Sequence, residues 1–303
     1  MTFPYSGQYM PLKNILCEDR FERGQCGWMD LMNNFVLPGH KPRPSIVEKT
    51  QWGPTMLSNL NFGYAGTHGA LNGSYALKLT TRPTAAPYDQ PPKEGSMGLS
   101  IKRLSARGKG KTQIELWYAY TPEQDRIGLG ETDIRAFGFC FDIQDENDRY
   151  FIGLRYLNSM DGQYVGRWQY AQANDVTDSQ WAYDTDGDWC KRGIDPMWFG
   201  KKHKDGSTDG WQWVPGGEQK LVYNESDDKI NWQYLRFTID TEKREYVSFQ
   251  SLDRTFDLSG IAPTMAPRYK GIQGLLNPLM WIEADKNRRV FLFIDSVTIS
   301  MDY

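Results

Sequence analysis

The chain has 303 residues, of which 24% are charged and 39% hydrophobic, the proportions of a soluble protein that buries a core. Its formal net charge of −3 argues against a nucleic-acid partner, because nucleic-acid-binding domains usually carry a basic face. The 11 tryptophans and 17 tyrosines can fill a core, but so many also favour exposed surfaces on which a ligand stacks.

The first fourteen residues carry no basic start and no long apolar run, which argues against a signal peptide. No segment approaches the about 20 apolar residues of a membrane helix, so we expect a cytoplasmic protein without a membrane partner. The chain has three histidines, too few for a histidine-rich metal centre. The cysteines lack metal-ligand spacing and are expected to be free thiols: Cys17, Cys26, Cys140 and Cys190.

Four strands are predicted in the first third of the chain, separated by loops rich in Gly, Pro and Asn. The clearest of them is Ser74–Thr80, where apolar and polar residues alternate. The other expected elements are a strand and bend at 16–31, short strands near 44–49 and at 99–104, and loops at 37–70 and 82–95.

The run QIELWYAY, residues 113–120, alternates strictly and predicts a strand with two distinct faces. The apolar face belongs in a core, and the other face is available for a ligand or for solvent. The two faces are Ile114, Leu116 and Tyr118 on one side, and Glu115 and Trp117 on the other.

Residues 134–157 predict a hairpin of two strands joined by the polar turn at 145–148. A turn centred on Glu146 and Asn147 fixes the register of the two strands. Four apolar residues of the first strand then face inward, namely Phe137, Phe139, Phe141 and Ile143. The outward face is small in its middle and charged at two places, with predicted pairs Asp142–Phe151, Cys140–Gly153 and Gly138–Arg155.

Strands continue to the C-terminus, and no amphipathic helical pattern longer than about three turns interrupts them. The sequence therefore predicts an all-β chain, a sandwich of two antiparallel sheets in one domain spanning 1–303, with a long aromatic-rich loop excursion at 165–230. The later strands are expected at 232–240, 244–249, 279–283 and 290–301.

The strand pattern resembles the concanavalin A-like, or laminin-G-like, jelly-roll superfamily, and within it a bacterial family without an assigned activity. The resemblance rests on NDRYFIGLRY, WQYLRFTID, the turn Asp257–Gly260 and FIDSVTIS. FERGQCGW and NGSYALKL are similar to the opening of jelly-roll carbohydrate-binding modules. The paired-glutamate motif of laminarinase-type hydrolases, E-x-D-x-x-E, is missing, which removes the simplest enzyme assignment.

The resemblance implies a ligand on the concave sheet, held by side chains that point away from the core. Sites for sugars combine aromatic platforms with carboxylate, amide and Arg hydrogen bonds. The alternative is an ordinary solvated sheet face. The expected substrate-binding residues are Trp117, Trp168, Tyr170, Trp232, Tyr234, Arg236 and Trp281.

Residues 166–213 hold eight Trp and Tyr residues among Asp, Gly and Lys, and a loop this long is usually functional or disordered. It either walls one end of the groove or packs its aromatics onto the sandwich. Within it, Asp184, Asp186 and Asp188 surround a glycine, a pattern that suits the hard oxygen ligation of Ca²⁺ or a solvated acidic turn. The resemblance implies a second place for structural Ca²⁺, with Glu18 or Glu22 beside Asp295. No organic cofactor is expected.

Hydrolysis of a glycoside needs two carboxylates, about 5–5.5 Å apart for retention and about 6.5–9.5 Å for inversion. Glu115 and Asp142 lie on strands that can be neighbours and form the first candidate pair, with Glu283 as the alternative partner. A lyase would instead need a base and an enolate-stabilising cation. The candidates for those roles are His68, Tyr234, Arg155 and Arg236.

We therefore expect a carbohydrate or glycoside ligand and favour an enzyme, a hydrolase or lyase that cleaves a small glycoside in the groove. The alternative is a non-catalytic carbohydrate-binding or assembly module, which can be a homo-oligomer. A structural protein without a ligand is the third reading, and it predicts a flat sheet covered by the aromatic loop.

Overall fold

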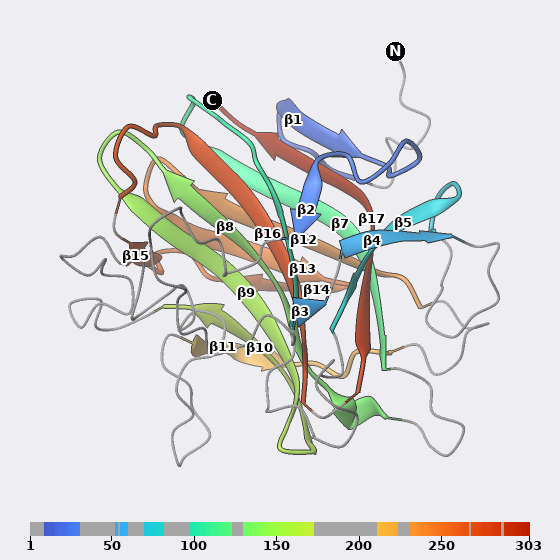
Figure 1. Cartoon of the computed structure of the whole chain (residues 1–303). Coiled ribbons are helices and arrows are strands. Elements are labelled where there is room, and N and C mark those ends of the chain that lie inside the picture. Colours follow the sequence, from blue (N-terminus) through green and yellow to red (C-terminus); the bar gives the residue numbers. More distant parts are fainter. Residues whose placement is uncertain are drawn as a thin grey trace, which may run out of the picture.

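A computed structural model gives the fold of the chain as two antiparallel sheets packed face to face (Figure 1). The described residues are 9–30, 52–53, 55–59, 70–81, 97–122, 130–172, 211–223, 231–266, 268–285 and 288–303. The short strand predicted near 44–49 lies outside them. In the described part of the chain the only helical element is a 3₁₀ turn at Glu131–Asp133, which confirms the predicted all-β jelly-roll sandwich.

The first sheet, called sheet A, places β17 near its centre, which explains why that strand is apolar on both faces at its start. Its strands, in spatial order, are β14 (Arg254–Asp257), β13 (Glu245–Ser251), β12 (Gln233–Asp240), β7 (Lys111–Pro122), β17 (Val290–Met301), β5 (Tyr75–Thr80) and β4 (Thr55–Asn59). The N-terminal strand β1 (Asn14–Asp19) pairs with the second half of β17.

The second sheet, called sheet B, is built around the predicted hairpin β8–β9. Its strands, in spatial order, are β11 (Trp211–Glu218), β10 (Gln163–Ala171), β9 (Arg149–Met160), β8 (Ile134–Gln144), β16 (Leu275–Ala284), β6 (Met97–Lys102) and β2 (Trp28–Asp30). Two short strands complete it, β15 (Thr264–Ala266) on β9 and β3 (Trp52–Gly53) on β6. The three predicted cross-strand pairs of the hairpin are all present.

The core between the sheets is aromatic. The Phe137 ring of β8 lies 4.8 Å from that of Tyr120 and 5.0 Å from that of Tyr118, both on β7 in the opposite sheet. Phe137, Phe139, Phe141 and Ile143 all belong to this core, as the alternation predicted. Burying side chains of this size contributes roughly 1.5–3 kcal/mol each, so these contacts hold the sheets together.

The predicted excursion at 165–230 is regular in part, because its described residues include most of β10 and all of β11. Trp168 of β10 is consequently a core residue with no exposed surface, and its indole N–H donates to Gln219 Oε1 at 2.9 Å. Cys17, Cys26 and Cys140 are free thiols. None of the helical structure in the described ranges has the length and apolar character to span a bilayer.

Candidate functional site

The predicted groove residues are divided between the two outer faces of the sandwich. Glu115 lies on β7 in sheet A and Asp142 on β8 in sheet B, with the aromatic core between the two sheets. The prediction that these carboxylates lie on neighbouring strands is therefore wrong. Strand alternation tells which side chains leave the core, but it does not tell which sheet a strand joins.

Asp142 has a structural partner on its own sheet. Its carboxylate accepts two hydrogen bonds from Arg149, Nε to Oδ1 at 2.8 Å and Nη2 to Oδ2 at 3.0 Å. The Arg149 guanidinium also stacks on Tyr269 at 4.0 Å. Both residues of the ion pair are buried. This bidentate geometry uses both oxygens of Asp142 and gives the residue a structural role.

Arg155, Trp281 and Glu283 meet on the outer face of sheet B. The indole N–H of Trp281 donates to Glu283 Oε1 at 2.8 Å, and Arg155 donates to Gln169 Oε1 at 2.9 Å and lies over Trp211 at 4.4 Å. Burial raises the pKa of Glu283 against the opposing charge of Arg155, and burial lowers the pKa of Arg155 to about 10.

This cluster is buried, although the sequence predicted an open groove there. Arg155 is 2% exposed, Trp281 0% and Glu283 1%. The small middle of the face, which was expected to leave room for a ligand, holds the Trp281 ring. A Cβ added to Gly138 would lie 2.1 Å from that ring, so the glycine is what allows the indole to approach β8 this closely.

The outer face of sheet A presents a group that we call the aromatic row: Glu115, Trp117, Trp232, Tyr234 and Arg236. Trp117 and Tyr234 are directly opposite each other on β7 and β12, with ring centroids 5.5 Å apart. Both rings are half-buried, as are Trp232 and Arg236. The structure thus brings together five of the predicted site residues on the outer face of one sheet.

Glu115 is the buried centre of this row. Its Oε1 accepts the hydroxyl of Tyr234 at 2.5 Å and the backbone N–H of Met10 at 2.8 Å. Gln113 in turn donates to the carbonyl of Met10 at 2.9 Å. Residues 9–13 therefore run across the sheet and are fixed to it. Burial and the bond to Glu115 raise the pKa of Tyr234, so its hydroxyl remains protonated as a donor.

Three polar atoms of the row are buried and have no hydrogen-bond partner within the described ranges. They are the second carboxylate oxygen of Glu115 and the indole nitrogens of Trp117 and Trp232. Buried polar groups in native proteins are nearly always paired, with protein, water or ligand. One free acceptor and two free donors on the same face therefore indicate a place where a polar ligand or ordered water completes the bonding.

Asp295 borders the row, because it pairs with Trp117 across β17 and β7. A bulge follows it, in which Ser296 has a φ of 53° and the extra residue leaves both Asp295 and Thr298 facing outward. Asp295 accepts the backbone N–H of Asn72 at 2.8 Å and the Ser296 hydroxyl at 3.0 Å. Burial raises its pKa to about 6 despite these hydrogen bonds.

The carboxylates predicted to share a structural Ca²⁺ with Asp295 have other partners. Glu18 pairs with Arg20, and Glu22 accepts the backbone N–H of Ser74 at 2.6 Å. No group of three or more His, Cys, Asp or Glu residues suited to a metal ion occurs among the residues described. The second predicted site, Asp184, Asp186 and Asp188, lies outside the described residues, as does His68, and both remain predictions.

Tyr170, also predicted to bind substrate, faces the interior, where its ring packs edge-on against Tyr246 at 5.7 Å. Conversely, sequence reasoning missed Met10 and placed Asp295 in a metal site only. An aspartate in an otherwise apolar strand was a detectable signal for Asp295. Nothing in the first fourteen residues indicated a contact with Glu115, 105 positions away.

A family model described as “Domain of unknown function (DUF6772)” matches residues 4–303. A search of curated proteins found none that matches the chain. Among solved structures it is similar to a carbohydrate esterase from Shiga toxin-encoding bacteriophage phi24B, at 10% identity and a TM-score of 0.41, over 95% of this chain and 99% of that one.

Two further similar structures are the legume lectin-like domain from Entamoeba histolytica and the cellulose-induced protein Cip1. The first has 8% identity and a TM-score of 0.39 over 82% of this chain and 90% of that one. The second has 13% identity and a TM-score of 0.39 over 94% of this chain and 96% of that one. Lectin domains are thus among the solved structures to which the chain is similar.

Proposed function

Because the chain belongs to the DUF6772 family, whose function its description leaves open, we propose a function from the site itself: carbohydrate binding on the outer face of sheet A. The ligand would stack on Trp117 and Tyr234, with Glu115 and Arg236 beside it. This proposal keeps the predicted ligand class and moves the site to a single sheet.

The observation that carries the proposal is the pairing of half-buried aromatic rings with unsatisfied polar atoms. Sugar rings offer apolar C–H faces, which pack on Trp and Tyr, and hydroxyl edges, which both donate and accept hydrogen bonds. The indole N–H groups of Trp117 and Trp232 and Oε2 of Glu115 are the complementary donors and acceptor on the protein. Arg236, which is opposite Glu115 in the register, adds a charged donor.

The burial and the hydrogen bonds of Glu115 favour carbohydrate binding over glycoside cleavage. The residue is 0% exposed, and Tyr234 and Met10 already occupy its Oε1. A general acid or nucleophile has to reach the glycosidic bond at hydrogen-bond distance, directly or through one water. Glu115 as placed here orders Tyr234 and the N-terminal arm and leaves one oxygen for a ligand.

Glycoside cleavage is the second candidate, and Asp295 is the observation that favours it. A carboxyl whose pKa is raised to about 6 can hold a proton near neutral pH, which a general acid must do. Asp295 borders the same row as Glu115, and these two carboxyls, both buried, would replace the pair first expected from the sequence. Product release from a panel of aryl and natural glycosides, lost on Asp295→Asn, would support this candidate over simple binding.

The test of the binding proposal is a neutral and acidic oligosaccharide panel, followed by titration calorimetry with the best ligand. Trp117→Phe keeps a ring and removes an indole N–H that has no protein partner, so folding stability should change little. Binding should weaken by roughly 2- to 10-fold, the worth of one hydrogen bond. Trp213→Phe on sheet B is the matched control and should bind as the wild type does. Equal affinity of the Trp117 variant, or no binding across the panel, would contradict the proposal.

A further inference from the structure

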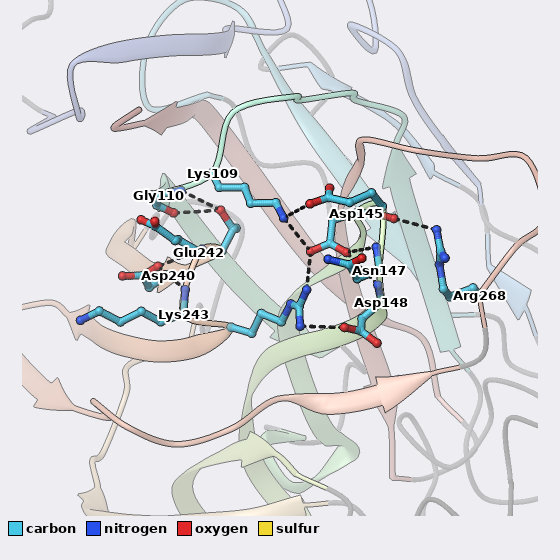
Figure 2. Close-up of polar contacts among 12 residues, drawn as sticks. Lys109, Gly110, Asp145, Asn147, Asp148, Asp240, Glu242, Lys243 and Arg268 are labelled. Carbon is cyan, nitrogen blue, oxygen red and sulfur yellow. Dashed lines mark hydrogen bonds and ion pairs between the residues drawn. The ribbon is translucent and has the colours of Figure 1, made fainter.

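A cleft of about 520 Å³ lies at one end of the sandwich, away from the aromatic row. It is lined by the segment 105–109, the β8–β9 turn, Thr241 and the start of β16. Figure 2 shows its polar wall, where Lys109 and Asp145 approach each other from different segments. The volume is within the roughly 300–1,000 Å³ of small-molecule sites. Its apolar lining includes Ile143, Leu275, Leu276 and Met301.

Lys109 and the carboxylates of the β8–β9 turn satisfy one another's charges in this wall (Figure 2). Lys109 pairs with Glu146 and, at 3.4 Å, with Asp145, and Arg244 pairs with Asp145 at 3.0 Å. Burial opposes the ionisation of Asp145, but the backbone N–H groups of Asp148 and Asn147 and the Arg244 guanidinium lower its pKa to about 2. The wall is therefore ionised and internally neutralised, with little net charge to attract a charged ligand.

Tyr150 is the exception in this lining. It is 1% exposed, and its hydroxyl has no hydrogen-bond partner in the part of the chain that the structure describes. Burial raises the pKa of this hydroxyl, as do the carboxylates of Asp145, Asp240 and Asp148, while the Arg244 guanidinium opposes the shift. The group is thus a neutral donor in a wall of little net charge, where a neutral acceptor oxygen is favoured over an ion, whose desolvation nothing would offset.

We propose that this cleft binds a small neutral molecule with an apolar body and one acceptor oxygen, such as an amide, ketone or alcohol. The apolar body packs on Ile143, Leu276 and Met301, and the oxygen accepts the hydroxyl of Tyr150. The cleft shares no residue with the aromatic row, so the two proposals stand or fall separately.

The probes are three cyclohexane derivatives of matched shape: the carboxamide, the carboxylate and the aminomethyl compound, which is a cation at neutral pH. Binding is followed by NMR on the full chain with methyl-labelled methionine. The Met301 signal reports on the cleft, and the signal of Met10, which is exposed and does not line the cleft, serves as the reference. We expect the carboxamide to shift the Met301 methyl signal with a Kd on the order of 1 mM and the two charged probes to bind at least about tenfold more weakly.

Tyr150→Phe removes only a hydroxyl that lacks a protein partner, so the variant should fold and should bind the carboxamide roughly 2- to 10-fold more weakly. The matched control is Tyr120→Phe, since Tyr120 is also buried with an unpartnered hydroxyl but does not line the cleft. The proposal is overturned if Tyr150→Phe binds as tightly as the wild type, if a charged probe matches the carboxamide, or if the Met301 signal does not move.

Discussion

The hydroxyl of Tyr234 donates a 2.5 Å hydrogen bond to Oε1 of Glu115, joining β12 to β7 on the outer face of sheet A. The same oxygen accepts the backbone N–H of Met10, so one carboxylate ties together two strands and the N-terminal arm. A buried carboxylate that loses a donor retains the cost of its desolvation. This relationship makes Tyr234 a structural residue as well as a candidate ligand contact.

We predict that Tyr234→Phe lowers the free energy of unfolding by about 1–3 kcal/mol, because the buried Oε1 of Glu115 loses one of its two donors. Urea unfolding measures the change. Tyr303→Phe serves as the control, since Tyr303 is 62% exposed at the C-terminus. A Tyr234 variant as stable as the wild type would mean that the bond to Glu115 contributes nothing to folding.

Asp295 gives stability an unusual pH dependence. Its pKa is raised from 3.8 to about 6 in the folded protein, so folding favours the protonated carboxyl. The stabilisation is complete below pH 4 and is lost as the pH rises from about 4 to about 6, by about 3 kcal/mol in all. Asp295→Asn should remove this loss. The free energy of unfolding of the variant should therefore rise relative to that of the wild type between pH 4 and pH 7.

The measurement for Asp295 is the free energy of unfolding at a series of pH values for both proteins. Asp253→Asn, at an exposed turn, is the comparison variant for the same change of carboxyl to amide. Parallel profiles for wild type and Asp295→Asn would show that this carboxyl does not titrate in the stated range.

Arg155 and Glu283 should be energetically coupled on the outer face of sheet B. Arg155→Met removes a nearby cation that offsets the burial of Glu283, so the variant should be less stable by about 1–3 kcal/mol. Glu283→Gln in the same background keeps the acceptor for the Trp281 indole and removes the charge, so stability should recover in part. A double-mutant cycle with a coupling energy near zero would contradict this electrostatic coupling.

Gly138 should tolerate no side chain, because its missing Cβ is the space in which the Trp281 ring lies. Gly138→Ala is expected to lower the free energy of unfolding by about 1–3 kcal/mol through overpacking. In a Trp281→Leu background the same substitution should cost much less, since the ring atoms that it meets are gone. Equal costs in the two backgrounds would place the strain elsewhere, for example at the Leu154 carbonyl, 2.6 Å away.

The hairpin at 134–157 could be predicted to the level of individual pairs, because strict alternation and a short polar turn together determine a register. The same alternation assigned Phe137 to the core and Glu115 to the outside. It could not show which of the two sheets each strand joins. β7 and β8 follow each other in the chain but belong to different layers, and only long-range contacts decide that.

The candidate site was predictable in its composition and not in its assembly. Glu115, Trp117 and Tyr234 were identified from their outward positions, and they do meet. Trp168 was wrongly placed outside, because its segment was interpreted as a loop and its strand period was overlooked. The contact between Met10 and Glu115 joins positions too distant in the chain for any local pattern to reveal.

The bulge at Ser296 inserts one residue into β17, and this residue could be deleted. Removing the extra residue would leave the inward and outward sides of the strand unaltered, so the sandwich could close with an ordinary strand there. A φ of 53° lies in the left-handed region, so Ser296, which has a side chain, is under local backbone strain. What the insertion supplies is the hydroxyl that reaches Asp295. A chain shortened by this single residue should still fold, and its altered chemistry would be confined to the surroundings of one carboxyl group.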